Sequence, residues 1–220
     1  IGGGKEDANP RLRKAIDDAK AANMPADNIK RAIQKGTGEI PGVVFEELTF
    51  EGYGPSGVAI YCEGSTDNRN RTTNEVRQIF ENTGGNMGAA GSVSFLFDRK
   101  GYLTIKRSAI AEDALLDLAL EAGADDLKTD DPELYEITCE PLALEKVSAA
   151  LKAKGLALES ASVSMLPKTS VPLDADAAPK VLELIEALEE YDDIAEVYAN
   201  FDIADEILAS LEKQGERSRF

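Results

Sequence analysis

The side chains that could do chemistry fall into three groups: cations near the start, a polar motif near the middle, and carboxylates in the second half. The chain has no His, which removes the commonest general base and metal ligand and every Ser-His or Cys-His nucleophile within these residues. Its two cysteines, Cys62 and Cys139, form no C-x-x-C pair and have no metal-ligand spacing. We therefore expect no catalytic residues, no metal, no cofactor and a non-enzymatic role.

The first group consists of cations on two short predicted helices. Asn9 followed by Pro10 predicts a helix from residue 10 to about 22, because Asn caps a free amide and Pro has no amide to lose. Pro25 predicts the start of a second helix, which Gly36 ends. Apolar residues recur at helical spacing on one side of each helix, so the cations fall outside. These cations are Arg11, Arg13, Lys14, Lys20, Lys30, Arg31 and Lys35.

This basic helical hairpin has two interpretations. Two helices with a short turn and outward cations are the outline of a helix-turn-helix DNA reader. Alternatively, Arg13 with Asp17 and Lys14 with Asp18 stand four residues apart and simply pair on a solvated surface. Two short helices bury too little apolar surface to stand alone, so we expect them to pack on a preceding segment or on the next domain.

The second group is the motif T-D-N-R-N-R-T at residues 66–72. Thr72 and Glu75 match a capping box, which predicts that a helix starts there. Arg69 and Arg71 would then lie just before a helix N-terminus, where guanidinium groups beside free amides suit a phosphate. The alternative is that both arginines pair with neighbouring carboxylates or with the acidic second half.

Two glycine-rich stretches match the sequence pattern of nucleotide-binding loops but lack the structural context that such loops need. G-Y-G-P-S-G at residues 52–57 fits G-x-G-x-x-G, but a predicted strand follows it where a dinucleotide site needs a helix N-terminus. G-G-N-M-G-A-A-G at residues 84–91 leads into a predicted strand over 92–97, so no helix dipole is available for an anion. We interpret both stretches as connections.

The third group, the carboxylates, gives the chain a formal net charge of −17. Taken over the whole chain, this net charge argues against nucleic-acid binding, because affinity for phosphate depends on Lys and Arg. Residues 1–42 hold 8 basic and 6 acidic side chains, residues 43–107 hold 7 and 8, and residues 108–220 hold 9 and 27. The basic front can therefore still contact nucleic acid locally. The acidic back is either a solvated face or a docking surface for a basic protein partner.

Short strands with hairpin links alternate with helices along the rest of the chain, which predicts an α+β fold of the split β-α-β type. The predicted strands are 47–51, 58–63, 134–139, 158–166 and 195–201, and the predicted helices are 109–122, 141–155 and 177–190. No run of about 18 apolar residues occurs, and no charged-then-apolar leader opens the chain. With two lone cysteines, this predicts a cytoplasmic protein without membrane contact.

The sequence resembles the YebC/PmpR family in several collinear segments that together span essentially the whole chain. These are N-P-R-L-R-K-A-I-D-D-A-K-A-A-N-M-P-A-D-N-I-K-R-A-I-Q-K-G at 9–36, T-F-E-G-Y-G-P-S-G-V-A-I-Y at 49–61, T-D-N-R-N-R-T at 66–72, G-G-N-M-G-A-A-G-S-V-S-F-L-F at 84–97 and Y-A-N-F-D-I at 198–203. One departure is G-P-S-G at 54–57, where many relatives have G-P-G-G. The family's opening A-G-H-S-K-W-like basic segment is not among these residues.

The resemblance implies a helical N-terminal domain followed by two ferredoxin-like α+β domains, one inserted in the other. On this sequence they are residues 1–42, residues 43–106 plus 172–220, and the inserted residues 107–171. Family members are usually described as DNA-binding transcriptional regulators, which makes DNA the expected partner of the cations above. The alternative is a ribosome-associated factor that binds ribosomal RNA, because mitochondrial relatives are described as translational activators of a cytochrome oxidase subunit.

Overall fold

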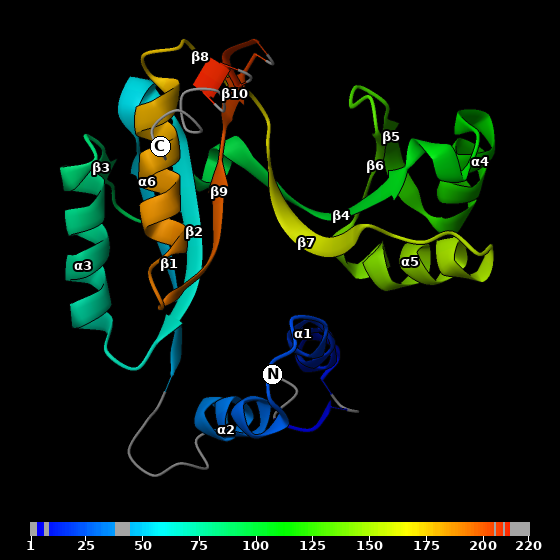
Figure 1. Ribbon diagram of the computed structural model, residues 1–220, viewed down its shortest axis with the longest axis horizontal. Coiled ribbons are helices and arrows are strands. Elements are labelled where there is room, and N and C mark those ends of the chain that lie inside the picture. The colour runs from blue at the N-terminus through cyan, green and yellow to red at the C-terminus, as the bar shows by residue number, and fades with distance from the viewer. Residues whose placement is uncertain (1–3, 7–8, 38–44, 205, 209, 212–220) are drawn as a thin grey trace, which may run out of the picture.

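The computed structural model describes residues 4–6, 9–37, 45–204, 206–208 and 210–211, and it confirms the predicted α+β class (Figure 1). The chain begins with a helical hairpin of α1 (Pro10–Ala21) and α2 (Ala26–Gly36). Asn9 caps α1 as predicted, because its Oδ1 accepts a hydrogen bond from the Leu12 amide at 3.1 Å. Between the helices, Asn23 has a φ of 59°, a left-handed conformation that Asn tolerates better than most residues.

The middle of the molecule is a four-stranded sheet with the strand order β3-β1-β2-β9. Its strands are β1 (Glu46–Tyr53), β2 (Ala59–Thr66), β3 (Asn86–Met87) and β9 (Ile194–Ala199). Helices α3 (Arg69–Asn82) and α6 (Ala178–Glu189) cover one face (Figure 1). Phe80 and Leu184 of these helices pack against Phe50 and Ile60 of the sheet. Because side chains alternate along a strand, the remaining residues of β1 and β2 lie on the opposite face.

A second four-stranded sheet follows, with the order β5-β6-β4-β7. Its strands are β4 (Phe97–Lys106), β5 (Ala124–Lys128), β6 (Leu134–Cys139) and β7 (Ser160–Pro167). Helices α4 (Glu112–Ala122) and α5 (Leu144–Ala153) pack against it through Leu115 and Leu151. The short strands β8 (Val171–Leu173) and β10 (Phe201–Ile203) then pair in parallel beside the middle sheet. Within the described ranges, none of the helices has the length and apolar character needed to cross a membrane.

The first glycine-rich stretch is a connection, as predicted, but the second is a connection only in part, because its residues Asn86 and Met87 form β3 and pair with β1. G-Y-G-P-S-G includes the turn that joins the antiparallel strands β1 and β2. The second stretch is held to the middle sheet by Glu51, which is 5% exposed. Its carboxylate accepts hydrogen bonds from the amides of Gly91 at 2.7 Å, Val93 at 2.7 Å and Ser94 at 2.8 Å.

The same contacts explain why the predicted strand over 92–97 is wrong. Residues Ser94–Leu96 form a short 3-10 helix, and β4 begins only at Phe97. An amide that donates to the Glu51 side chain does not take part in a strand ladder, so the strand starts after the last of these bonds. Strand β4 pairs with β6 and β7 of the second sheet, and its first residue, Phe97, packs with Ala59 of the middle sheet.

Candidate nucleic-acid interface

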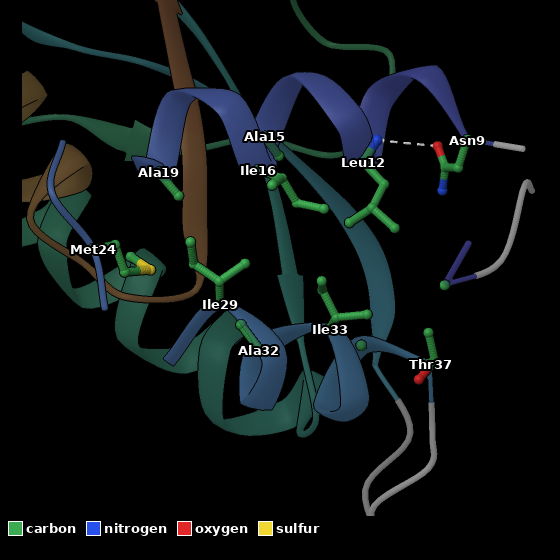
Figure 2. A pocket seen from close by; sticks show the side chains of 12 residues that line it. Asn9, Leu12, Ala15, Ile16, Ala19, Met24, Ile29, Ala32, Ile33 and Thr37 are labelled. Carbon is green, nitrogen blue, oxygen red and sulfur yellow. Dashed lines mark hydrogen bonds between the residues drawn. The ribbon is translucent and has the colours of Figure 1, made fainter. Parts of the chain in front are cut away.

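The helices of the hairpin face each other with apolar side chains (Figure 2). Leu12 and Ile16 of α1 and Ile29 and Ile33 of α2 line a groove of about 690 Å³. Ile16 is 6% exposed, which makes it the most deeply placed of these side chains. Because the apolar residues point into this groove, the helical period leaves the other faces to polar side chains.

The predicted cations lie on those outer faces. The exposed ones are Arg13, Lys14, Lys20, Lys30, Arg31 and Lys35, whereas the side chain of Arg11 lies outside the described residues. Lys20 Nζ is 3.9 Å from Asp17 Oδ1, and both side chains are more than half exposed. Arg13 Nη2 donates to the backbone oxygen of Glu6 at 3.2 Å. An exposed pair such as Lys20 and Asp17 contributes little to stability, so Lys20 is available to a stronger anion.

At the end of α2, Lys35 approaches the middle domain. Its Nζ lies 4.9 Å from the centre of the Phe45 ring, a cation-π distance. Lys35 and Arg71 also line the same polar cavity, which has a volume of about 420 Å³. The cavity walls include the carboxylates of Asp67, Glu75, Asp192 and Asp193. These four acids outnumber the two cations, so the cavity is a poor site for phosphate.

The start of α3 differs from the prediction. The helix begins at Arg69, and its N-cap is Asn68, whose Oδ1 accepts a hydrogen bond from the Arg71 amide at 3.2 Å. The predicted helix start at the capping box of Thr72 is therefore wrong, because the helix begins about one turn earlier. The Thr72 hydroxyl donates to Asp193 Oδ2 at 2.6 Å and is not an N-cap acceptor. Arg69 and Arg71 consequently lie inside the first turn of the helix rather than before it.

Both arginines already have carboxylate partners, as the alternative interpretation predicts. Arg69 Nη1 is 2.9 Å from Glu46 Oε2. Arg71 Nη2 is 2.6 Å from Asp193 Oδ2 and 3.2 Å from Asp67 Oδ1. The hydrogen bond to Asp193 is the main reason why the pKa of Arg71 is raised. A phosphate at Arg71 would have to displace the half-buried network around Asp193, whereas the exposed Arg69–Glu46 pair contributes as little to stability as the Lys20–Asp17 pair.

Asp193 is the centre of a polar network that the sequence does not reveal. Besides Arg71 and Thr72, the Thr66 hydroxyl donates to its Oδ2 at 3.0 Å. Burial acts to raise the pKa of Asp193, but the hydrogen bonds from Thr72, Arg71 and Thr66 outweigh it, and the pKa is lowered. The two threonines at the ends of T-D-N-R-N-R-T were the available signal. Their acceptor lies more than 120 positions away and follows no local spacing.

The eight predicted cations whose side chains are described are all exposed, but they differ in their partners. Arg69 and Arg71 contact carboxylates and Lys35 lines the acidic cavity. The remaining hairpin cations, Arg13, Lys14, Lys20, Lys30 and Arg31, lie on the outer faces of α1 and α2. Exposed cations on two adjacent helices can contact the phosphates of a nucleic-acid backbone, and this needs no catalytic group. The hairpin is thus the better candidate for a nucleic-acid interface.

Comparison with known proteins identifies relatives along nearly the whole chain. A family model described as the TACO1/YebC second and third domain matches residues 45–201. A second model, the TACO1/YebC protein N-terminal domain, matches residues 1–39.

Individual relatives agree with these matches. A probable transcriptional regulatory protein of Koribacter versatilis is 54% identical over 91% of this chain and 80% of its own. A probable transcriptional regulatory protein of Endomicrobium trichonymphae is 50% identical over 95% of this chain and 84% of its own. A crystal structure of a conserved hypothetical protein from Aquifex aeolicus superposes with a TM-score of 0.81 at 48% identity, and it covers 94% of this chain and 85% of that one.

Proposed function

Because this chain belongs to the TACO1/YebC family, whose curated relatives are named probable transcriptional regulatory proteins, we propose that it is a non-enzymatic regulator of gene expression that binds DNA. The outer faces of α1 and α2 make the contact, and the cations of these faces lie against backbone phosphates. We further propose that it acts in the cytoplasm, since both of its cysteines are buried free thiols.

One observation carries the proposal: the two faces of the hairpin differ in character. Apolar side chains line the groove between the helices, and exposed cations occupy the outside. Residues 1–42 have a small positive charge inside a strongly acidic protein. Each Lys or Arg that neutralises a phosphate releases a counterion, so even a small basic surface supports binding that weakens as salt rises.

The test measures binding of a fluorescently labelled DNA duplex to the full chain by anisotropy between 50 and 200 mM salt. Lys30→Gln with Arg31→Gln removes two adjacent exposed cations from α2. We expect weaker binding, with the slope of log affinity against log salt reduced by about two, because roughly one counterion is released per phosphate contact.

The matched control is Lys152→Gln with Lys154→Gln, which removes two exposed cations at the end of α5. It changes the net charge equally and should leave both affinity and slope as in the parent protein. Equal effects of the two pairs would mean that the duplex responds only to total charge, and the hairpin interface would be rejected.

A second candidate is a ribosome-associated translation factor whose hairpin binds ribosomal RNA and whose acidic half meets basic proteins. The distribution of charge favours it, because residues 108–220 carry 27 acidic and 9 basic side chains. Such a surface repels DNA but is attracted to cationic proteins. Co-sedimentation with ribosomes after nuclease removal of DNA, lost in Lys30→Gln with Arg31→Gln, would support this candidate over a promoter-binding regulator.

A further inference from the structure

The face of the middle sheet opposite α3 and α6 carries polar and aromatic side chains. It is defined here as the outer sheet face and consists of Thr49, Tyr61, Glu63, Glu196 and Tyr198. Their strand neighbours Phe50, Cys62 and Val197 belong to the core under the helices, so alternation places the five residues outside. Figure 1 shows that neither helix of the middle domain covers this side.

Two carboxylates of this face lie directly opposite each other. Glu63 of β2 and Glu196 of β9 are paired in the antiparallel register. Among the described residues, neither forms an ion pair. Like charges directly opposite in a sheet repel and destabilise the pairing. A cation placed between Glu63 and Glu196 would remove this repulsion and gain two charge-assisted hydrogen bonds.

The adjacent register position holds two tyrosines. Tyr61 and Tyr198 are paired across the same strands, and their ring centres are 6.4 Å apart. Burial and then the charges of Glu196 and Glu63 raise the pKa of Tyr198 to about 12. Burial and then Glu63 also raise the pKa of Tyr61. Both hydroxyls therefore stay protonated and lie near the carboxylate pair.

The outer sheet face is closed at one end and open at the other. Val93 and Phe97 pack against Tyr61 and Tyr198, so the tyrosine end is covered. Beyond the tyrosines, Thr49 and Glu196 are exposed and Glu63 is half-buried. A ligand can therefore reach the carboxylates from solvent, with the tyrosines forming a wall behind them.

Two kinds of macromolecule bind aromatic residues on a sheet. Single-stranded nucleic acid stacks its bases on such rings. Arg99 places one positive charge near both tyrosines, but phosphates on this face would also meet the carboxylates of Glu63 and Glu196. A protein segment with arginine or lysine side chains meets the same carboxylates favourably. We propose that the outer sheet face binds a cationic segment of a protein partner, with one guanidinium or ammonium group held between Glu63 and Glu196.

This surface is separate from the basic hairpin and independent of the DNA interface. It places the attraction for a basic protein at one pair of register partners, Glu196 of the acidic half and Glu63 of the middle segment. The partner is recognised by its chemistry, a run of arginines or lysines in an extended segment. The carboxylate pair supplies the specificity, because it lies beside two tyrosine rings on one sheet face, whereas the carboxylates of the cavity around Asp193 already hold Arg71.

The experiment uses the full chain and a fluorescein-labelled deca-arginine peptide at 150 mM salt. Glu63→Gln with Glu196→Gln keeps the shape of both side chains and removes both charges. We expect about a tenfold loss of peptide affinity. The matched control is Glu183→Gln with Glu186→Gln on the exposed side of α6, which should change affinity by less than about twofold. Equal losses in the two variants would overturn the proposal.

Amide NMR spectra of the full chain identify where the peptide sits. The largest shifts are expected at residues 61–63 and 196–198, and shifts centred on α4 or α6 would contradict the proposal. A labelled oligouridylate is the nucleic-acid arm: if it shifts the same amides while deca-arginine does not, the face binds nucleic acid. The thermal unfolding midpoint of the Glu63→Gln, Glu196→Gln protein should not fall, because the change removes a repulsion.

Discussion

Asp193 joins the ends of three segments, because it accepts hydrogen bonds from Thr66 at the end of β2 and from Arg71 and Thr72 in α3. Its side chain is 14% exposed, so water competes weakly for these bonds. Substitutions that remove this acceptor take away a shared partner of Arg71 and of the buried hydroxyls of Thr66 and Thr72.

We predict that Asp193→Ala lowers the free energy of unfolding by about 1–3 kcal/mol at pH 7, because buried donors lose their acceptor. The pKa of Asp193 is lower in the folded protein than in the unfolded chain. Its contribution is therefore fully present above about pH 4 and is lost as the pH falls through the folded pKa. Urea titrations at pH 7 and pH 3 should show a difference from the parent protein that shrinks at the lower pH. A difference that does not depend on pH would contradict this prediction.

Glu51 has a comparable role for the loop that precedes β4. Its pKa is lowered although burial opposes this, because the amides of Gly91, Val93 and Ser94 donate to the carboxylate. We predict that Glu51→Gln costs about 1–3 kcal/mol, since an amide NH₂ would then face backbone donors. Hydrogen exchange of the Gly91 and Val93 amides should also accelerate. Glu47→Gln, an exposed position on the same strand, should stay within about 0.5 kcal/mol.

At the scale of elements, substitutions at the N-terminus of α3 test which residue caps this helix. We predict that Asn68→Ala lowers stability by about 1 kcal/mol, because its side chain accepts from the Arg71 amide. The same substitution at Asn70, an exposed residue of the first turn, should cost little. Guanidinium denaturation of both variants measures the difference. A larger loss at position 70 than at position 68 would place the cap elsewhere.

Helix ends were predictable where the signal is local. The Asn9 and Pro10 pair identified the start of α1, and Gly123, with a φ of 105°, ends α4. The start of α3 was not predictable, because Asn68 and Thr72 are both good N-cap residues. The choice between them depends on Asp193, which takes the Thr72 hydroxyl from a distant part of the chain. Local propensity cannot resolve such a competition.

The candidate nucleic-acid interface shows the same difference between features that local sequence predicts and contacts that it does not. Helical periodicity was enough to place Lys30 and Arg31 outside the hairpin, since the apolar residues determine which face is inward. It could not show that Arg71 pairs with Asp193 or that Lys35 shares a cavity with Arg71. Those contacts join segments far apart in the sequence, and only the packing of the elements creates them.

At the scale of the whole molecule, charge and topology are arranged together. The basic hairpin precedes the middle sheet in the chain. The second sheet is connected to the middle sheet through its strands β4 and β7. These two strands are antiparallel neighbours, so the chain leaves the middle domain and returns to it at nearly the same place. An insertion with adjacent ends can fold as a unit without disturbing its host.

This topology predicts that the second sheet can be removed. Asp98 and Leu166 are register partners, and the Lys168 amide donates to the Leu96 oxygen at 2.9 Å. Replacing residues 99–165 with Asn-Gly should therefore close a tight hairpin. The core under α3 and α6 contains no residue of the excised segment, so unfolding should stay cooperative. The loss of half-buried Met165 should lower stability by no more than about 1–3 kcal/mol. A broad thermal transition with dye binding to exposed apolar surface would show that the middle domain needs the insertion to fold.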